Sequence, residues 1–363
     1  MTSKKEEIYS VITGTGSYIP EIIVPNKNFL ANTFYDNEGN ILEAKNPEII
    51  EKFKKITNIE ERRYIGDKYV TSDMATIAAK KAIETSNTDP ESIDYIIVAH
   101  NFGDVKPNNL NIDIVPSLAS RVKYKLGIKN PYAVGYDVIF GCPGWLQGVI
   151  QANYYIKSGE AKKALVIGAE TLSRVSDPHD RDSMIYSDGA GATILEGRTS
   201  EEPIGILSHA TRTDAFQYAH LLGMDKSYNP NITTSELYLK MNGRKLYEYA
   251  LNYVPLLVKH CMEKAKLTLT KINKVLIHQA NEKMDEAILQ RLYKLFGTGK
   301  YDPSIMPMTI NKLGNNSVAS LPILLDLILN GKLAEHKISA LDNLVFASVG
   351  AGMNINAITY RAV

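Results

Sequence analysis

The chain has 363 residues, of which 44% are hydrophobic and 22% charged, which is typical of a globular protein with one large domain or two ordinary ones. Its formal net charge of +1 and pI near 7.7 provide no broad electrostatic field, which argues against nucleic acid or an anionic membrane as a partner. Only Cys142 and Cys261 could form a disulfide or a thiolate metal site, and their separation and dissimilar contexts indicate neither. We therefore expect no metal.

The first residues, 1–7, are polar and lead directly into an apolar run. No long hydrophobic segment follows that could serve as a secretion signal or cross a membrane. Together with the scarcity of cysteine, this predicts a cytoplasmic protein.

Short apolar, β-branched runs alternate with segments whose apolar residues recur at helical spacing. The predicted strands are 11–13, 93–98, 164–167, 192–195, 275–277 and 344–347. The predicted helices are 74–84, 144–156, 243–266, 282–296 and 318–329. Two polar connections rich in turn-forming residues, 32–47 and 102–116, are expected to be loops. The alternation predicts an α/β fold.

The chain also contains an internal repeat. The corresponding segments, in the same order, are 93–98 with 272–277 and 144–168 with 318–348. We therefore predict two similar halves, residues 1–197 and 198–363. The helix that begins after Cys142 then corresponds to the helix near Asn315, so two helix N-termini could face one cavity.

Cys142 follows an apolar strand and lies in a sharp glycine-flanked turn before a helix with Pro143 at its start. This context is typical of a nucleophile elbow, and the positive end of the helix dipole should lower the pKa of the thiol. A small buried core residue is the alternative interpretation, which we favour for Cys261 because it lies in the middle of a helix.

Three further segments could complete a site around this thiol. His278 directly follows a predicted strand, where α/β folds place functional groups, although a structural histidine is the alternative. Asn315 could supply an amide donor beside it, whereas Asn316 could cap the next helix. The turn 350–352 is small enough to bring its backbone N–H groups close to a ligand and form an oxyanion hole with Cys142.

Several ordered motifs resemble those of the β-ketoacyl-acyl-carrier-protein synthase III family of thiolase-fold condensing enzymes. The motifs are Gly14–Pro20, Thr57–Arg62, Asp177–Arg181, Asp188–Ala192, His278–Asn281 and Gly314–Ser317. The resemblance extends from about Ile12 to Tyr360 and implies a five-layered α-β-α-β-α fold of two similar halves. It also implies a homodimer.

The resemblance implies a Cys-His-Asn triad in which Cys142 carries the acyl chain, while His278 and Asn315 bind a malonyl thioester during decarboxylation. It implies an oxyanion hole to which the backbone of Cys142, Ala351 and Gly352 contributes. Coenzyme A or acyl-carrier-protein thioesters would then be substrates, and no bound cofactor is expected.

The residues that bind coenzyme A and acyl carrier protein in this family are only partly matched in the sequence. Arg181 corresponds to the family arginine near the coenzyme A adenine, but Lys52 stands where the family has an aromatic partner. A solvated helix face is the alternative for all the basic residues that could dock acyl carrier protein. Those residues are Arg244, Lys245, Lys283 and Arg291.

The implied activity is that of a ketosynthase of fatty acid biosynthesis, which condenses the acyl group on Cys142 with malonyl-acyl-carrier protein. One alternative is condensation of two acyl or β-ketoacyl thioesters with cyclisation, as in dialkylresorcinol or aryl polyene secondary lipids. A thiolase would need a second catalytic cysteine near the C-terminus, and the 350–352 turn has none. The presence of Cys142, His278 and Asn315 argues against a further alternative, a non-catalytic partner subunit.

Overall fold

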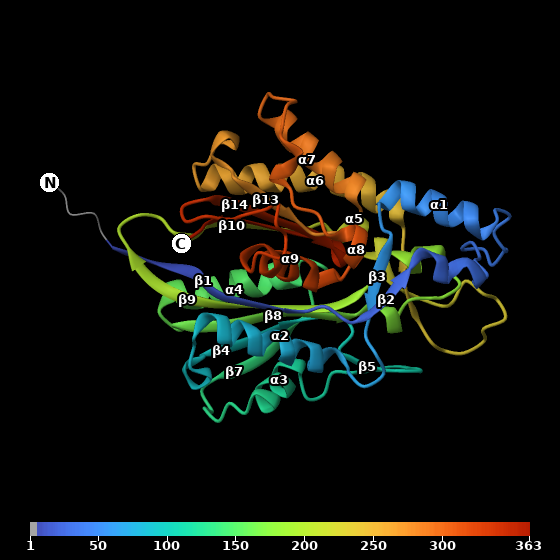
Figure 1. Ribbon diagram of the computed structural model, residues 1–363, viewed down its shortest axis with the longest axis horizontal. Helices are drawn as coiled ribbons and strands as arrows, with labels where there is room; N and C mark the ends of the chain where they lie inside the picture. Colours follow the sequence, from blue (N-terminus) through green and yellow to red (C-terminus); the bar gives the residue numbers. More distant parts are fainter. Residues whose placement is uncertain (1–5) are drawn as a thin grey trace.

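Two central β-sheets alternate with three helical layers (Figure 1). The computed structural model describes residues 6–363. The first sheet has the strand order β1 (Glu7–Tyr18), β9 (Asp188–Ser200), β8 (Lys163–Thr171), β4 (Tyr95–Ala99) and β7 (Val134–Val138). The second has the order β10 (Gly205–Thr213), β15 (Asn354–Arg361), β14 (Asn343–Gly350) and β13 (Lys274–Ile277).

Helices cover both faces of each sheet. Those between the two sheets are α4 (Gly144–Ser158) and α9 (Ser320–Leu329). The outer layers contain α2 (Thr71–Ser86) and α3 (Leu118–Leu126) on the first sheet, and α6 (Gly243–Lys264) and α7 (Glu282–Leu295) on the second (Figure 1). The expected five-layered α-β-α-β-α fold is confirmed.

The sequence of α9 explains why this helix occupies the middle layer. Its side chains are apolar almost all round, and every residue from Ser320 to Ile328 is buried. A helix without a polar face is stable only where protein surrounds it. Asp326, one of its few polar residues, accepts a hydrogen bond of 2.6 Å from Ser17 of β1.

The internal repeat is visible in the sheet topology. In the first half β4 pairs in parallel with β8, which pairs antiparallel with β9. In the second half β13 pairs in parallel with β14, which pairs antiparallel with β15. The prediction of two similar halves is thus confirmed, whereas a boundary between residues 197 and 198 stays a prediction.

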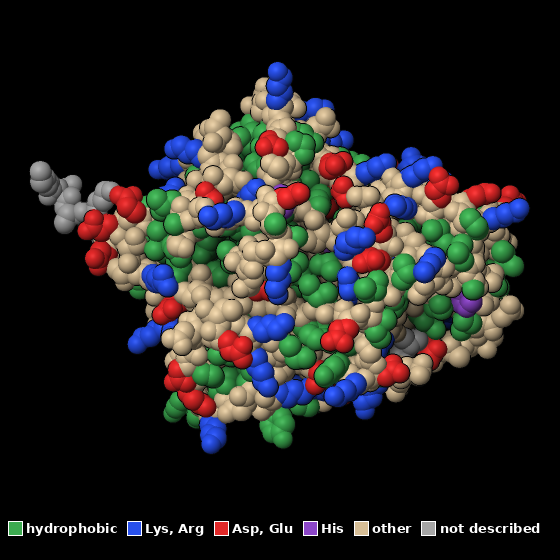
Figure 2. Space-filling view, viewed as in Figure 1, with side chains coloured by type: hydrophobic (Ala, Val, Ile, Leu, Met, Phe, Trp, Pro, Cys, Tyr) green, Lys and Arg blue, Asp and Glu red, His purple; other side chains and the backbone are tan. Residues whose placement is uncertain are grey.

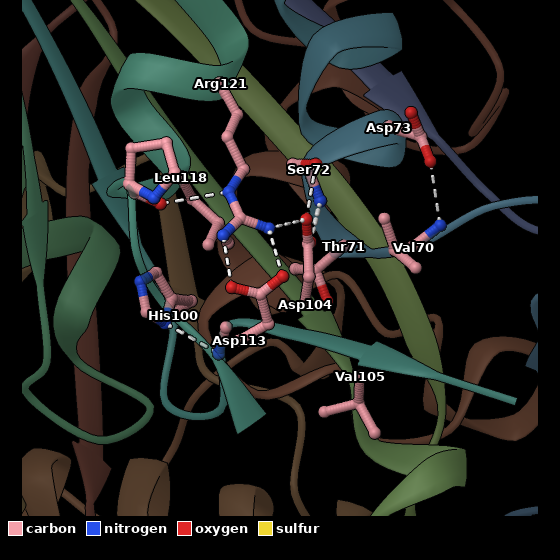
Figure 3. Close-up of polar contacts among 12 residues, drawn as sticks. Val70, Thr71, Ser72, Asp73, His100, Asp104, Val105, Asp113, Leu118 and Arg121 are labelled. Carbon is pink, nitrogen blue, oxygen red and sulfur yellow. Dashed lines mark hydrogen bonds and ion pairs between the residues drawn. The ribbon is translucent and has the colours of Figure 1, made fainter. Parts of the chain in front are cut away.

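The expected loop 102–116 is partly wrong, because it contains the hairpin of β5 (Asp104–Lys106) and β6 (Asn109–Asp113). Figure 3 shows how Arg121 of α3 contacts both Asp104 and Asp113. Ser72 of α2 donates from its backbone and its hydroxyl to Asp104, each at 2.7 Å. These charged contacts fix a segment whose turn-forming composition indicated only a loop.

The other predicted loop, 32–47, ends in a helix, because α1 (Asn46–Thr57) already includes Pro47 near its N-terminus. The remaining helices are α5 (Ala215–Tyr218) and α8 (Ile310–Leu313). Two further small sheets pair β2 (Ile22–Pro25) with β3 (Glu61–Tyr64) and β11 (Leu222–Asp225) with β12 (Tyr238–Met241). Across residues 6–363, no helix combines the length and the apolar character needed to cross a membrane.

Candidate active site

A cavity of about 230 Å³ lies where the two halves meet, and Cys142, His278 and Asn315 all line it. Cys142 precedes α4, His278 follows β13, and Asn315 lies between α8 and α9. The structure therefore brings together the three residues that the sequence indicated. Most of the remaining wall is apolar: Phe102, Ile139, Leu172, Leu222, Met224, Leu239, Met241, Leu246, Met284 and Val349.

Two glycines allow the turns from the two halves to approach each other. Gly141 has a φ of +65°, and a Cβ atom there would lie 2.5 Å from the backbone nitrogen of Ala351. A Cβ atom on Gly350 would lie 2.4 Å from the backbone nitrogen of Cys142. Because no larger residue fits at either position, the backbone around Cys142 is held directly against the turn after β14.

This contact bears on the predicted oxyanion hole. Ala351 lines the cavity beside Cys142, as does Gly350. Gly352 has a φ of +76° and lies next to the side chain of Asn354, and it is not among the described residues that line the cavity. The position of the Ala351 N–H group supports its predicted role more directly than that of Gly352.

The protonation state of Cys142 differs from the expectation. Although part of Cys142 opens to the cavity, the surrounding protein desolvates the thiol, and this burial raises its pKa to about 11. A hydrogen bond from Ser317 Oγ to the sulfur, at 3.5 Å, opposes the shift without reversing it. The prediction of a net lowered pKa is therefore wrong, because desolvation of the thiol outweighs any lowering by the helix N-terminus.

His278 is a neutral imidazole held by two contacts. Its backbone N–H donates to Ala347 at 2.9 Å, and its Nδ1 atom lies 2.6 Å from Ser320 Oγ. Its side chain is only 2% exposed, and burial lowers the pKa of the imidazole to about 4. With Nδ1 occupied by Ser320, Nε2 is the atom left to act on a ligand.

Asn315 is fixed by its backbone and by one side of its amide. Its N–H donates to Ile185 and its carbonyl accepts from Ser187, both at 2.9 Å. The side-chain Oδ1 accepts from the N–H of Ser317 at 2.8 Å, and within residues 6–363 the Nδ2 group has no hydrogen-bond acceptor. Asn315 therefore keeps a neutral donor available at the cavity, beside neutral His278.

Cys261 and Asn316 have structural surroundings. Cys261 is fully buried in the core, where its sulfur lies 3.2 Å from Ser208 Oγ, which confirms the core interpretation. The interpretation of Asn316 as a helix cap is wrong, because its side chain makes no capping hydrogen bond to the next helix. Its Nδ2 instead donates to the carbonyl of Asp188 at 2.9 Å and so holds the start of β9.

The residues expected to bind larger substrates lie on the surface. Arg181 is exposed at the start of a short 3-10 helix (Arg181–Ile185), and Lys52 is exposed on α1. Arg244, Lys245 and Lys283 are exposed as well. In the face shown in Figure 2, basic and acidic side chains are interspersed.

Two of the four docking candidates also have partners within the chain. Arg244 forms an exposed ion pair with Glu248 at 3.2 Å. Arg291 donates to the side chain of Asn252 at 2.6 Å and to the carbonyl of Leu251 at 3.2 Å. These contacts favour a structural role for Arg291, and docking by all four residues stays a prediction.

Four further residues near the site were not predicted: Asn101, Glu170, Ser317 and Ser320. Ser317 is adjacent to the indicated Asn315-Asn316 pair, and Ser320 lies one helical turn further on. Glu170 directly follows one apolar run and Asn101 lies two residues after another, and this proximity is the one available signal. Their contacts join distant parts of the chain, as in the bond between Asn101 and Ser317, which spans 216 residues.

The fold and this Cys-His-Asn arrangement define a condensing acyltransferase. The 3-oxoacyl-(acyl-carrier-protein) synthase III family matches residues 136–215, and the C-terminal region of the same family matches residues 262–362. The chain belongs to this family, as the resemblance implied.

Solved structures of this family are similar to this chain over nearly its whole length. The 3-oxoacyl-(acyl-carrier-protein) synthase III of Aquifex aeolicus is 28% identical over 97% of this chain and 99% of its own, with a TM-score of 0.79. The synthase III of Thermus thermophilus is 28% identical over the same shares, with a TM-score of 0.80. The priming β-ketosynthase of a polyketide pathway has the same fold at 23% identity, covering 100% of this chain and 98% of its own, with a TM-score of 0.80.

Proposed function

We propose that this enzyme loads an acyl group onto Cys142 and condenses it with a malonyl thioester carried by acyl carrier protein. The observation that carries the proposal is the convergence of one thiol and two neutral donors, from His278 and Asn315, on one apolar cavity. The apolar walls suit a hydrocarbon chain, and the donors suit the oxygen of a thioester.

In the first half-reaction the sulfur of Cys142 attacks the carbonyl carbon of an acyl thioester. Negative charge develops on the carbonyl oxygen, and in this proposal the N–H groups of Cys142 and Ala351, which both line the cavity, donate to it. The bond to the departing thiol then breaks. That thiol leaves with the proton that Cys142 lost, and the acyl chain stays on the enzyme.

In the second half-reaction a malonyl thioester loses carbon dioxide, and its thioester oxygen becomes an enolate oxygen. Nε2 of His278 and Nδ2 of Asn315 donate to this oxygen, and both groups are neutral, so that they stabilise the new charge without a metal ion. The enolate carbon attacks the acyl thioester and expels the sulfur of Cys142, which takes up a proton. The product is a β-ketoacyl thioester.

The partners belong to the same proposal. The name of the matched family supports acyl carrier protein as the carrier of the malonyl group, docked near Arg244, Lys245, Lys283 and Arg291. If the acyl donor is a coenzyme A thioester, Arg181 would contact its coenzyme A portion. We also propose a cytoplasmic homodimer. The exposed apolar residues Ile112, in β6, and Ile114 and Val115, just after it, support an apolar contact with a second copy.

The experiment that tests this function supplies an acyl thioester and malonyl-acyl-carrier protein labelled in the free carboxyl group. Release of the label together with a β-ketoacyl product is expected from the wild type, whereas Cys142→Ala should give no condensed product. Condensation that retains the label would contradict the decarboxylative reaction. A cyclised product containing two long chains would instead favour the secondary-lipid alternative.

A further inference from the structure

The hydroxyl of Ser317 contacts the sulfur atom of the proposed nucleophile. Ser317 Oγ donates to Cys142 Sγ at 3.5 Å, and both residues line the same cavity. Ser317 is only 5% exposed. Because the contact is largely buried, a hydrogen bond to a charged sulfur has more effect here than it would have on the surface. In the proposed reaction His278 and Asn315 act on the malonyl thioester, so Ser317 is a separate donor for the sulfur.

The neighbours of the Ser317 hydroxyl determine the direction of this hydrogen bond. Asn101 Nδ2 donates to Ser317 Oγ at 3.2 Å and to Glu170 Oε2 at 2.7 Å. The backbone N–H of Asn101 also donates to Glu170 Oε1, at 3.3 Å, which holds the amide in place. An amide nitrogen can only donate, so Ser317 Oγ is the acceptor in its contact with Asn101. The hydroxyl hydrogen then points to the sulfur of Cys142.

The backbone around Ser317 holds the hydroxyl in this position. Its φ is +51°, in the left-handed region that residues with a side chain rarely adopt, and its N–H donates to Asn315 Oδ1 at 2.8 Å. Gly168 of β8 lets this segment approach the first sheet, because a Cβ atom there would lie 2.3 Å from the carbonyl oxygen of Val318. A glycine would adopt the conformation of Ser317 without strain. The hydroxyl is therefore present where the backbone disfavours a side chain.

The surroundings of Cys142 otherwise disfavour a thiolate. Burial raises the pKa of the thiol to about 11, and a negative Glu170 contributes to the rise. The hydrogen bond from Ser317 is the larger of the two contacts that lower this pKa. Hydrogen bonds to an ionised partner are roughly twice as strong as those between neutral groups. The contact with Ser317 therefore strengthens when the thiol loses its proton.

We propose that the hydroxyl of Ser317 is a further catalytic group, which donates to the sulfur of Cys142 whenever that sulfur carries negative charge. This inference rests on the proposed acyl loading and condensation. In loading, the hydroxyl stabilises the thiolate whose electron pair forms the bond to the acyl carbon, and the thiol proton ends on the departing thiol. In condensation, the enolate carbon bonds to the acyl carbon and the carbon–sulfur bond breaks. The hydroxyl stabilises the same thiolate as it leaves, before the sulfur takes up a proton from water. Ser317 keeps its own proton throughout.

The test removes the hydroxyl with Ser317→Gly and with Ser317→Ala. Both variants keep the backbone N–H that donates to Asn315, and glycine also adopts a positive φ without strain, so Ser317→Gly should fold. Leu341→Gly is the matched control. Leu341 also has a positive φ, +71°, but it is 68% exposed and is not among the described residues that line the cavity. Thermal unfolding of each variant measures its stability.

Three rates are compared in the wild type and the variants. The first is alkylation of Cys142 by iodoacetamide between about pH 7 and about pH 9, with peptide mass mapping to assign the modified residue. The second is acyl loading from an acyl thioester. The third is release of carbon dioxide from malonyl-acyl-carrier protein supplied without an acyl donor.

In both Ser317 variants, alkylation and acyl loading should fall at least about threefold, because the thiolate becomes scarcer, although each thiolate becomes somewhat more nucleophilic. Blocked access cannot cause this loss, since either substitution only removes atoms beside the sulfur. Release of carbon dioxide should keep the wild-type rate, because it depends on His278 and Asn315. Leu341→Gly should match the wild type in all three rates.

A folded Ser317→Gly that is alkylated at the wild-type rate would overturn the inference. Equal losses of acyl loading and carbon dioxide release would also overturn it, because Ser317 would then act by holding Asn315. Alkylation does not depend on the proposed substrates. A wild type that is alkylated faster than both variants but accepts no acyl group would therefore contradict the proposed function and support the hydrogen bond to the sulfur.

Discussion

The Nδ1 atom of His278 lies 2.6 Å from the hydroxyl of Ser320, at the start of a buried helix from the same half of the chain. If the hydroxyl donates to Nδ1, the imidazole carries its proton on Nε2 and can donate it to an enolate oxygen. Ser320 then positions the proton that the second half-reaction needs.

Replacing Ser320 with Ala should therefore affect the two half-reactions differently. We expect release of carbon dioxide from malonyl-acyl-carrier protein to slow by about tenfold, because the Nδ1 proton is no longer excluded, while acyl loading of Cys142 changes little. Single-turnover measurements of each half-reaction check this. Equal losses in both would show that Ser320 only maintains the structure.

Replacing Asn315 with Asp preserves the oxygen that accepts from Ser317 but removes the Nδ2 donor. Because a carboxylate oxygen would then face the developing enolate charge, we expect condensation to fall by about 10²–10³-fold. The rate of β-ketoacyl product formation measures the effect, with thermal unfolding as the control for folding. Condensation at the wild-type rate would exclude Nδ2 from the reaction.

Replacing Gly141 with Ala should destabilise the protein and misplace the nucleophile, because the new Cβ atom would lie 2.5 Å from the nitrogen of Ala351. Gly127 is a matched control: its φ of +73° is similar, but no atom lies within 4 Å of its added Cβ. Gly127→Ala should lose about 1 kcal/mol of unfolding free energy, and Gly141→Ala clearly more, together with most acyl loading. Equal losses in the two variants would mean that the turns can separate at little cost.

Stability should depend on pH through Glu170. Burial raises the pKa of its carboxyl group from 4.5 to about 7, so the folded protein holds this proton more tightly than the unfolded chain. This contribution is therefore greatest below about pH 4.5 and is lost as the pH rises through about 7. Relative to Glu170→Gln, the wild type should lose on the order of 3 kcal/mol of unfolding free energy over this window. Urea denaturation of both proteins between about pH 5 and about pH 8 measures the difference in their unfolding free energies. A difference that does not change with pH would show that Glu170 does not titrate in this range.

The elements with strong local patterns were predictable from the sequence. The strand before His278 and the turn at Cys142 have clear apolar and glycine signals, and the repeat indicated that they would meet. The β5–β6 hairpin was missed because contacts from other elements, such as Arg121, fix it rather than its own sequence pattern.

The electrostatics of the site were less predictable. The pKa of Cys142 rises because desolvation by residues from both halves outweighs the local effect of its helix. The carboxyl group of Glu170 reaches this thiol only through Ser317 and Asn101, which are remote from it in the sequence. Ser, Asn and Glu occur widely in structural roles, so neither spacing nor composition distinguishes these three residues.

Acyl loading of Cys142 is the most direct test of the account. Wild type and Cys142→Ala are incubated with acyl thioesters of short, medium and long chain length, on coenzyme A and on acyl carrier protein, and their intact masses are measured. We predict the addition of one acyl group to the wild type, mapped to Cys142, with buried Cys261 unmodified and the variant unchanged. A wild type that stays unmodified at Cys142 with every donor would contradict the proposed function.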